Sequence, residues 1–185
     1  MPERQSPGES KKRALSRKPK LIVFDFDGIF TDNRVLVHED GRESVWCHRG
    51  DGLGVAMLSA KGIPMLVLST ERNPVVSARC KKLGLPCHQG IADKLQTLKA
   101  LVEERGVHPK DVVYVGNDIN DLMCMEWVGC SVTVKDAEPQ VLKKADVVLD
   151  KKGGKGAVRQ LCDWVLQSLD DPKPLRSVSP GLSYR

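Results

Sequence analysis

One stretch constrains the fold of this chain more than any other, because residues 20–32 join a short apolar run to two closely spaced carboxylates. Leu21–Phe24 consists of four apolar residues, two of them β-branched, which is typical of a strand buried on both faces of a parallel sheet. Asp25 and Asp27 follow directly, and on extended backbone their side chains point the same way. Gly28 then permits a sharp turn. Open α/β sheets bind ligands at the carboxyl ends of their strands, so this strand end is predicted to be part of a functional site.

Strand-like and helix-like segments alternate along the rest of the chain. This alternation predicts a single three-layer α/β domain with a mostly parallel sheet. The further strands are expected at residues 63–68, near 87, and at 111–115, 131–134 and 147–149. The helices are expected at residues 51–60, 74–83, 94–105, 122–128, 138–144 and 157–169.

The first crossover is predicted to begin with a β-hairpin. Residues 34–38 and 43–47 are rich in β-forming side chains, and Asp40 and Gly41 lie between them. An Asp-Gly pair between two such runs is a strong hairpin signal. The hairpin therefore precedes the first helix.

Charge and composition divide the chain of 185 residues into three parts. The net charge is +5, but residues 1–20 hold seven basic and two acidic residues, so the remainder is close to neutral. We expect a disordered basic arm over residues 1–19, a folded domain over 20–169 and a disordered tail over 170–185. The near-neutral domain lacks the basic stripe of nucleic-acid-binding proteins, so we expect no nucleic-acid partner. The alternative is salt-sensitive binding of nucleic acid through the arm alone.

Targeting signals and cysteine usage point to the cytoplasm. No apolar run approaches the length of a membrane span, and the N-terminus resembles no secretory signal. The six cysteines include no CxxC pair, which argues against a structural zinc site and for reduced, mostly buried thiols. We therefore expect no membrane partner and a cytoplasmic location.

Side chains suited to phosphoryl transfer follow several predicted strands. A carboxylate can attack phosphorus, and a second acid can protonate the leaving oxygen and then activate water. A hydroxyl and a lysine can hold phosphate oxygens, and a hard divalent cation can offset the repulsion between anionic groups. The simpler interpretation is that Asp25 and Asp27 are two solvated acids at a strand end. That interpretation does not explain the suitable partner side chains that follow the later strands. The candidates are Asp25, Asp27, Ser69, Thr70, Lys94, Asn117, Asp118 and Asp121.

These residues resemble a known family. The pattern Asp25-x-Asp27-Gly28-x-x-Thr31-Asp32, followed by Ser69, Lys94 and Gly116-Asn117-Asp118-x-x-Asp121, resembles the haloacid dehalogenase superfamily of phosphohydrolases. The hairpin and the segments at residues 51–54, 89–95 and 153–159 are similar to 3-deoxy-D-manno-octulosonate 8-phosphate phosphatases and nonulosonate 9-phosphate phosphatases. The phosphatase-like module of some acylneuraminate cytidylyltransferases is similar too. The resemblance implies a haloacid dehalogenase-like Rossmannoid fold that carries a β-hairpin flap in place of a cap domain.

The resemblance also implies roles for individual residues. Asp25 would be the nucleophile, and Asp27 the general acid and base that also offers its backbone carbonyl to Mg²⁺. Ser69 and Lys94 would bind the transferring phosphoryl group. The candidate Mg²⁺ ligands are Asp25, Asp27, Asn117, Asp118 and Asp121. The family usually has Asp where this chain has Asn117, so either Asn117 or Asp118 would complete the metal site.

Substrate contacts are expected in the loop after the second strand and near the hairpin. Octulosonate phosphatases commonly carry Thr-Gly-Arg-Lys where this chain has Ser69-Thr70-Glu71-Arg72, and Glu71-Arg72 favours a nine-carbon sugar acid. Arg79 and His48 are further candidates for substrate binding. For both, the alternative is an ordinary surface or structural residue.

Two functional hypotheses follow from the sequence. The first is a Mg²⁺-dependent phosphatase that hydrolyses a 2-keto-3-deoxy sugar acid phosphate through an aspartyl-phosphate intermediate. The second is a catalytically weak oligomerisation or regulatory module associated with an acylneuraminate cytidylyltransferase, suggested by Asn117 and the altered substrate loop. The resemblance further implies a homotetramer in which neighbouring subunits close each active site.

Overall fold

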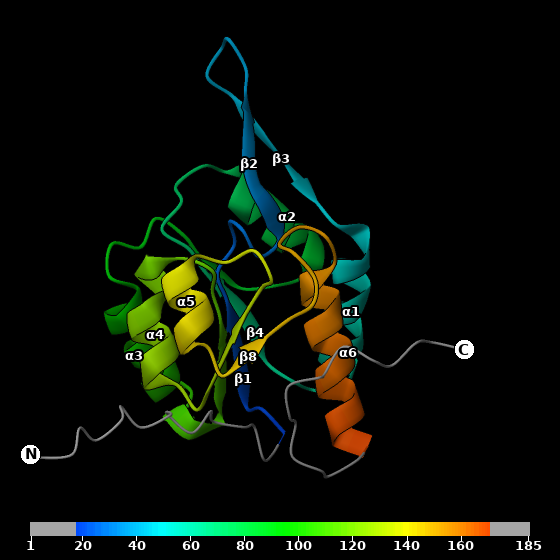
Figure 1. Cartoon of the computed structure of the whole chain (residues 1–185), viewed down its shortest axis with the longest axis vertical. Helices are drawn as coiled ribbons and strands as arrows, with labels where there is room; N and C mark the ends of the chain where they lie inside the picture. Colours follow the sequence, from blue (N-terminus) through cyan, green and yellow to red (C-terminus); the bar gives the residue numbers. More distant parts are fainter. Residues whose placement is uncertain (1–17, 171–185) are drawn as a thin grey trace, which may run out of the picture.

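Six short strands form one parallel sheet through the middle of the computed structural model, which describes residues 18–170 (Figure 1). The strand order is β5-β4-β1-β6-β7-β8, and every neighbouring pair is parallel. All residues of the four central strands are buried, and in three of them an unbroken apolar run predicts this burial. The strands are β1 (Leu21–Phe24), β4 (Met65–Leu68), β5 (Cys87–His88), β6 (Val112–Val115), β7 (Cys130–Thr133) and β8 (Val147–Val148).

Helices cover both faces of this sheet and complete three layers. Figure 1 shows α1 and α6 side by side on one side of the sheet and α3, α4 and α5 on the other. The predicted α/β fold with a parallel sheet is therefore confirmed. The helices are α1 (Arg49–Ala60), α2 (Val75–Leu83), α3 (Lys94–Glu104), α4 (Leu122–Trp127), α5 (Pro139–Lys144) and α6 (Ala157–Asp170), with short 3₁₀ turns η1 (Pro109–Asp111) and η2 (Ile119–Asp121).

Capping residues read from the sequence mark the ends of two helices. Oδ1 of Asn73 accepts a hydrogen bond from the amide of Val75 at 3.0 Å, and Gly84 ends the same helix with a φ of 69°. Oδ1 of Asp93 accepts from the amide of Gln96 at 2.9 Å and so fixes the start of α3. Each cap satisfies an otherwise unpaired terminal group.

The predicted hairpin projects from the domain as strands β2 (Thr31–Val37) and β3 (Glu43–Cys47) (Figure 1). Its pairing shifts register between Thr31 and Val35, where Asn33 has a φ of 60°. Nδ2 of Asn73 donates to Oε2 of Glu43 at 2.9 Å, which ties the hairpin to the loop before α2.

Helices α1 and α6 cross closely, and one side chain of α1 also caps α6. Asp51 is fully buried, and its Oδ1 accepts from the amide of Arg159 in the first turn of α6 at 3.0 Å. A Cβ on Gly54 would lie 2.9 Å from Cβ of Cys162 and 3.2 Å from Cα of Arg159. The absence of a side chain at Gly54 is what permits this crossing.

Gly54→Val should therefore destabilise the fold. The added side chain cannot fit without moving the backbone of α6, and overpacking of this kind costs about 1–3 kcal/mol. Chemical unfolding in urea would measure the change in stability. Gly62→Val is not a matched control, because Gly62 has a φ of 68° and any side chain there would add backbone strain. Ala56→Val is matched, since this exposed residue lies on the same helix. Equal stability of the Gly54 and Ala56 variants would contradict the close-crossing argument.

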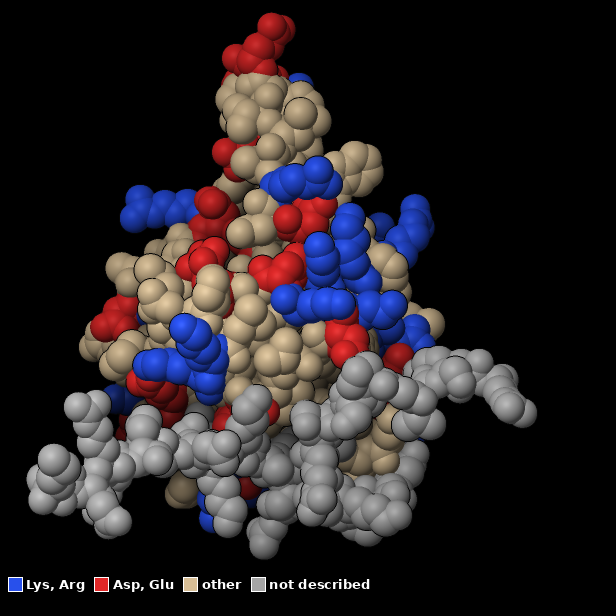
Figure 2. Space-filling view, viewed as in Figure 1, with Lys and Arg blue, Asp and Glu red and all other residues tan. Residues whose placement is uncertain are grey.

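A charged group lies where the hairpin joins the domain. Oδ2 of Asp32 lies 2.7 Å from Nη2 of Arg34 and 3.4 Å from Nζ of Lys155, next to the glycine-rich turn before α6. Figure 2 shows basic side chains around acidic ones below the hairpin. The hydrogen bond from Arg34 is the main cause that holds the pKa of Asp32 below its usual range.

This lowered pKa predicts how stability changes with pH. Because the unfolded chain takes up the proton first, the contribution of Asp32 is present above the unfolded pKa of about 3.9 and is lost as the pH falls through the lower folded-state pKa. Urea midpoints for wild type and Asp32→Asn should differ near neutral pH and converge in acid. A difference that does not change with pH would show that the charge of Asp32 contributes nothing.

The cysteines of the chain all lie among the described residues. All six cysteines are free thiols and four are buried, as expected from their spacing. Within residues 18–170, no helix combines the length and apolar character needed to cross a bilayer. The predicted arm and tail lie almost wholly outside the described residues, so their predicted disorder stays a prediction.

Candidate active site

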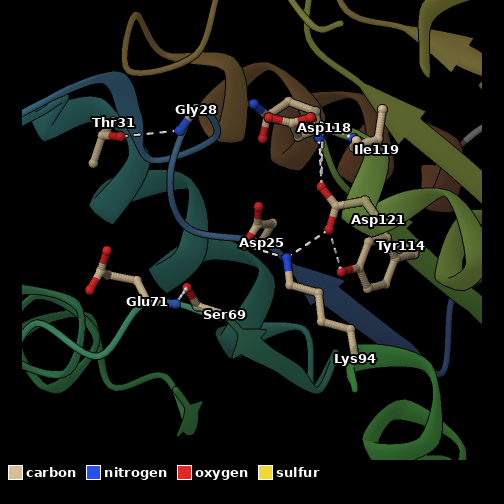
Figure 3. Close-up of polar contacts among 11 residues, drawn as sticks. Asp25, Gly28, Thr31, Ser69, Glu71, Lys94, Tyr114, Asp118, Ile119 and Asp121 are labelled. Atoms are coloured by element: carbon tan, nitrogen blue, oxygen red, sulfur yellow. Dashed lines mark hydrogen bonds and ion pairs between the residues drawn. The ribbon is translucent and has the colours of Figure 1, made fainter. Parts of the chain in front are cut away.

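Asp25 lies at the carboxyl end of the central strand β1. Its amide donates to the carbonyl of Val115 at 2.8 Å, so the pairing of β1 with β6 continues up to the carboxylate. Asp25 is only 6 % exposed. Behind it, the ring of Phe30 packs against Phe24 and Phe26, and this apolar support holds the loop that carries the two carboxylates. The amide of Gly28 donates to Oγ1 of Thr31 at 3.1 Å and closes the turn (Figure 3).

Lys94 joins two carboxylates that are far apart in the sequence. Its Nζ lies 2.8 Å from Oδ1 of Asp25 and 2.8 Å from Oδ1 of Asp121 (Figure 3). Lys94 is 4 % exposed and Asp121 is fully buried. An ammonium group between two carboxylates offsets their mutual repulsion, so the three groups can be buried together.

Asp121 uses both carboxylate oxygens within the protein. Oδ1 accepts from Nζ of Lys94 and from the hydroxyl of Tyr114, and Oδ2 accepts from the amides of Asn117 and Asp118. These four bonds fill the acceptor capacity of a carboxylate. In this structure both oxygens of Asp121 are therefore engaged within the protein, where they contact Lys94 and the loop after β6.

Burial changes the protonation of the two carboxylates after β1. Burial, with a contribution from the charge of Asp121, raises the pKa of Asp25 to about 7, against the opposing effect of Lys94. Burial and then the charge of Glu71 raise the pKa of Asp27 above its usual range. Burial acts to lower the pKa of Lys94, but the negative charges of Asp25 and Asp121 outweigh burial, so the pKa of this ammonium group is raised. At neutral pH, Asp27 is thus better able to carry a proton than an exposed aspartate.

Ser69 follows β4 and is buried beside the same strand end. Its Oγ accepts from the amide of Glu71 at 3.1 Å (Figure 3). Oε1 of Glu71 accepts from the amides of Arg72 and Asn73 at 2.6 and 2.7 Å, so this carboxylate stabilises its own loop. Thr70 and Arg72 are exposed on that loop.

The other two predicted substrate-binding residues meet at the base of the hairpin. Nη2 of Arg79 donates to the carbonyl of His48 at 3.1 Å, and Nδ1 of His48 accepts from the amide of Gly50 at the start of α1. These contacts give both residues a structural role. Their contact with a substrate stays a prediction.

The loop after β6 supplies the group that best fits a metal ion near Asp25. Within residues 18–170, no three His, Cys, Asp or Glu side chains are grouped to hold a metal ion. Asn117 lies outside that set of residue types, and its Oδ1 is buried without a hydrogen-bond partner in the described part of the chain. Oxygen atoms of carboxylates, amides and main-chain carbonyls are the ligands that Mg²⁺ accepts. Asp25, Asp27 and Asn117 therefore fit such an ion, while Oδ1 of Asp118 already accepts from the amide of Ile119.

Sequence reasoning missed two parts of this arrangement. Tyr114 was assigned only to a buried strand, although a buried tyrosine hydroxyl requires a polar partner, and that requirement was the available signal. The close approach of Gly28 to Asn117 gave no sequence signal, because the two loops are distant in the chain. A Cβ on Gly28 would lie 2.2 Å from Nδ2 of Asn117.

Comparisons with known proteins agree with the motif. A family model for haloacid dehalogenase-like hydrolases matches residues 88–161. The chain is 34 % identical over 164 residues to the 3-deoxy-D-manno-octulosonate 8-phosphate phosphatase KdsC of Escherichia coli K12, covering 86 % of this chain and 87 % of that protein.

Solved structures show the same relationship. A Streptomyces avermitilis protein assigned to the HAD family hydrolases is 47 % identical, with a TM-score of 0.80 and coverage of 85 % of this chain and 100 % of that one. The Moraxella catarrhalis 3-deoxy-D-manno-octulosonate 8-phosphate phosphatase, solved with magnesium, phosphate and KDO, is 30 % identical with a TM-score of 0.80, covering 83 % of this chain and 89 % of that one.

The motif at the end of β1, the parallel sheet and these relatives agree on one assignment, which confirms the resemblance seen in the sequence. The chain belongs to the haloacid dehalogenase-like hydrolases and is a phosphatase that cleaves phosphoric monoesters.

Proposed function

We propose that this phosphatase hydrolyses the phosphate ester of a 2-keto-3-deoxy sugar acid, either an octulosonate 8-phosphate or a nonulosonate 9-phosphate. The observation that carries the phosphoryl-transfer part of the proposal is Lys94, held 2.8 Å from both Asp25 and Asp121. The octulosonate phosphatases among the relatives support the eight-carbon acid. Glu71 and Arg72, where those enzymes commonly carry other residues, favour the nine-carbon acid.

In the proposed reaction, a carboxylate oxygen of Asp25 attacks phosphorus while the bond from phosphorus to the sugar oxygen breaks. Asp27, whose raised pKa helps it hold a proton, gives that proton to the leaving oxygen. An aspartyl phosphate on Asp25 results. Asp27 then takes a proton from a water molecule, and the water oxygen attacks phosphorus. The bond from phosphorus to the Asp25 oxygen breaks, which releases inorganic phosphate and restores the Asp25 carboxylate.

The remaining residues bind and orient the phosphoryl group. Lys94 and Ser69 offer hydrogen-bond donors to its oxygens, and Asp121 keeps Lys94 in place. Asp25, the backbone carbonyl of Asp27 and Oδ1 of Asn117 would hold Mg²⁺, with Asp118 as the alternative to Asn117. A bound Mg²⁺ supplies charge neutralisation for the encounter of an anionic nucleophile with an anionic ester.

Phosphate release from a panel of sugar phosphates tests this function. The panel should include eight- and nine-carbon keto-deoxy acid phosphates, each with Mg²⁺ and with excess EDTA. We expect turnover of at least one of these acids that depends on Mg²⁺ and is restored after EDTA by added Mg²⁺. No turnover of any keto-deoxy acid phosphate would overturn the proposed substrate and favour the catalytically weak module.

We also infer that the chain assembles into an oligomer, as the family resemblance to a homotetramer implies. The hairpin exposes apolar side chains that monomers rarely leave in contact with water, among them Leu36 at 57 % and Trp46 at 71 % exposure. Sedimentation should detect a species larger than the monomer, and Trp46→Glu should shift it toward the monomer. A monomeric wild type at micromolar concentration would contradict this inference, and an association with a cytidylyltransferase stays a prediction from resemblance.

A further inference from the structure

Asn117 places a carboxamide where the loop after β6 meets the loop that carries Asp25. Its amide donates to Oδ2 of Asp121 at 3.0 Å, and its carbonyl accepts from the amide of Glu138 at 2.9 Å. The residue is 6 % exposed. Because the backbone is held on both sides and the residue is buried, packing leaves the side chain little freedom to turn away from the active site.

The amide side chain reaches the catalytic loop through a gap left by a glycine. Gly28 has a φ of 75°, and any Cβ there would lie 2.2 Å from Nδ2 and 3.0 Å from Oδ1 of Asn117. Oδ1 is buried and has no hydrogen-bond partner among residues 18–170. A buried acceptor without a partner is unfavourable, so this oxygen is suited to a cation or another donor supplied from outside the chain.

The charges around this oxygen explain why an amide differs from a carboxylate here. Asp25, Asp27 and Asp121 bring three carboxylates to the site, Asp118 and Glu71 add two more beside it, and Lys94 brings one ammonium. A further carboxylate at residue 117 would attract a divalent cation more strongly. It would also repel the dianionic phosphoryl group, because charges at short range in a buried site interact strongly.

Resting on the proposed function, we propose that Asn117 is a neutral metal ligand that shifts the binding preference of the site from the cation toward the phosphoryl group. The protein alone then binds Mg²⁺ weakly. The Mg²⁺-loaded site is less negative than it would be with a carboxylate at residue 117, so it binds phosphate more tightly. Metal ion and phosphorylated substrate thus depend on each other for binding.

Two binding constants of Asn117→Asp test the proposal without any turnover. Calorimetry should show that the variant binds Mg²⁺ at least about tenfold more tightly than wild type, in the absence of phosphate. With saturating Mg²⁺, the variant should bind inorganic phosphate at least about tenfold more weakly. The opposite signs matter, since a general loss of structure would weaken both.

Asp118→Asn is the matched comparison, because it makes the reverse change one residue further along. If Asn117 is the ligand, Asp118→Asn leaves the Mg²⁺ affinity within about threefold of wild type, as expected for a charge outside the metal ligands. A large loss of Mg²⁺ affinity in Asp118→Asn, with no gain in Asn117→Asp, would assign the ligand to Asp118 and overturn the proposal. If Asn117→Asp does not fold, Asn117→Ala provides the test: loss of Mg²⁺ binding even with phosphate present supports the proposal, and retained binding overturns it.

The outcome is separable from that of the sugar phosphate panel. Opposite shifts in the two constants together with a silent panel would leave the role of Asn117 intact and remove the proposed substrate. Turnover on the panel with neither constant changed in Asn117→Asp would remove only the role of Asn117.

Discussion

Asp25→Asn should abolish phosphate release while leaving the fold intact. The amide cannot act as the attacking carboxylate, and removing a nucleophile commonly lowers kcat by a factor on the order of 10⁴ to 10⁶. The chain should fold, because the substitution preserves shape and leaves Lys94 paired with Asp121 at 2.8 Å. Steady-state phosphate release and thermal unfolding monitored by circular dichroism would measure the two properties.

Asp150→Asn is the matched control for this experiment. It makes the same chemical change at an exposed residue, whose Oδ2 accepts a hydrogen bond from Nε2 of Gln160. Its turnover should equal that of wild type. Substantial activity in Asp25→Asn, beyond what contaminating phosphatase in a mock purification explains, would remove Asp25 from the role of nucleophile.

Lys94→Met should impair both stability and turnover. The ammonium lies between two buried carboxylates, and removing one partner of a buried ion pair costs about 3–5 kcal/mol because the remaining charges are left uncompensated. Urea unfolding should show this loss as a lower midpoint with an unchanged m-value. Turnover should fall in the same variant, because a donor to the phosphoryl oxygens is lost.

Two further variants separate the ion pair from the helix that carries it. Lys99→Met lies on the same helix α3, where its Nζ is 5.9 Å from the ring centre of Trp127, and we expect a cost below about 1 kcal/mol. Lys94→Met combined with Asp121→Asn should be more stable than the sum of the two single changes predicts, because the double variant removes a carboxylate that had lost its partner. Strict additivity, or a Lys94 variant as stable as the Lys99 variant, would argue against the buried ion pair.

Much of the fold could be predicted because it depends on local patterns. The apolar run at Leu21–Phe24, the Asp-Gly turn of the hairpin and the caps at Asn73 and Asp93 each involve residues within a few positions of one another. Hydrogen bonds over such short separations follow from residue type and spacing. The alternation of these segments then predicted the parallel sheet, because parallel strands require a crossover between them.

The sheet, the hairpin and the set of side chains at the carboxyl edge of the sheet thus follow from residue types and their spacing along the chain. Which of those side chains pair with one another follows from the packing of the domain. In the folded domain Lys94 lies between Asp25 and Asp121, the hydroxyl of Tyr114 has a carboxylate partner, and Oδ1 of Asn117 has no hydrogen-bond partner among the described residues. The physical reason is that burial energies and hydrogen-bond partners depend on distances across the packed domain, and residue spacing along the chain does not fix those distances.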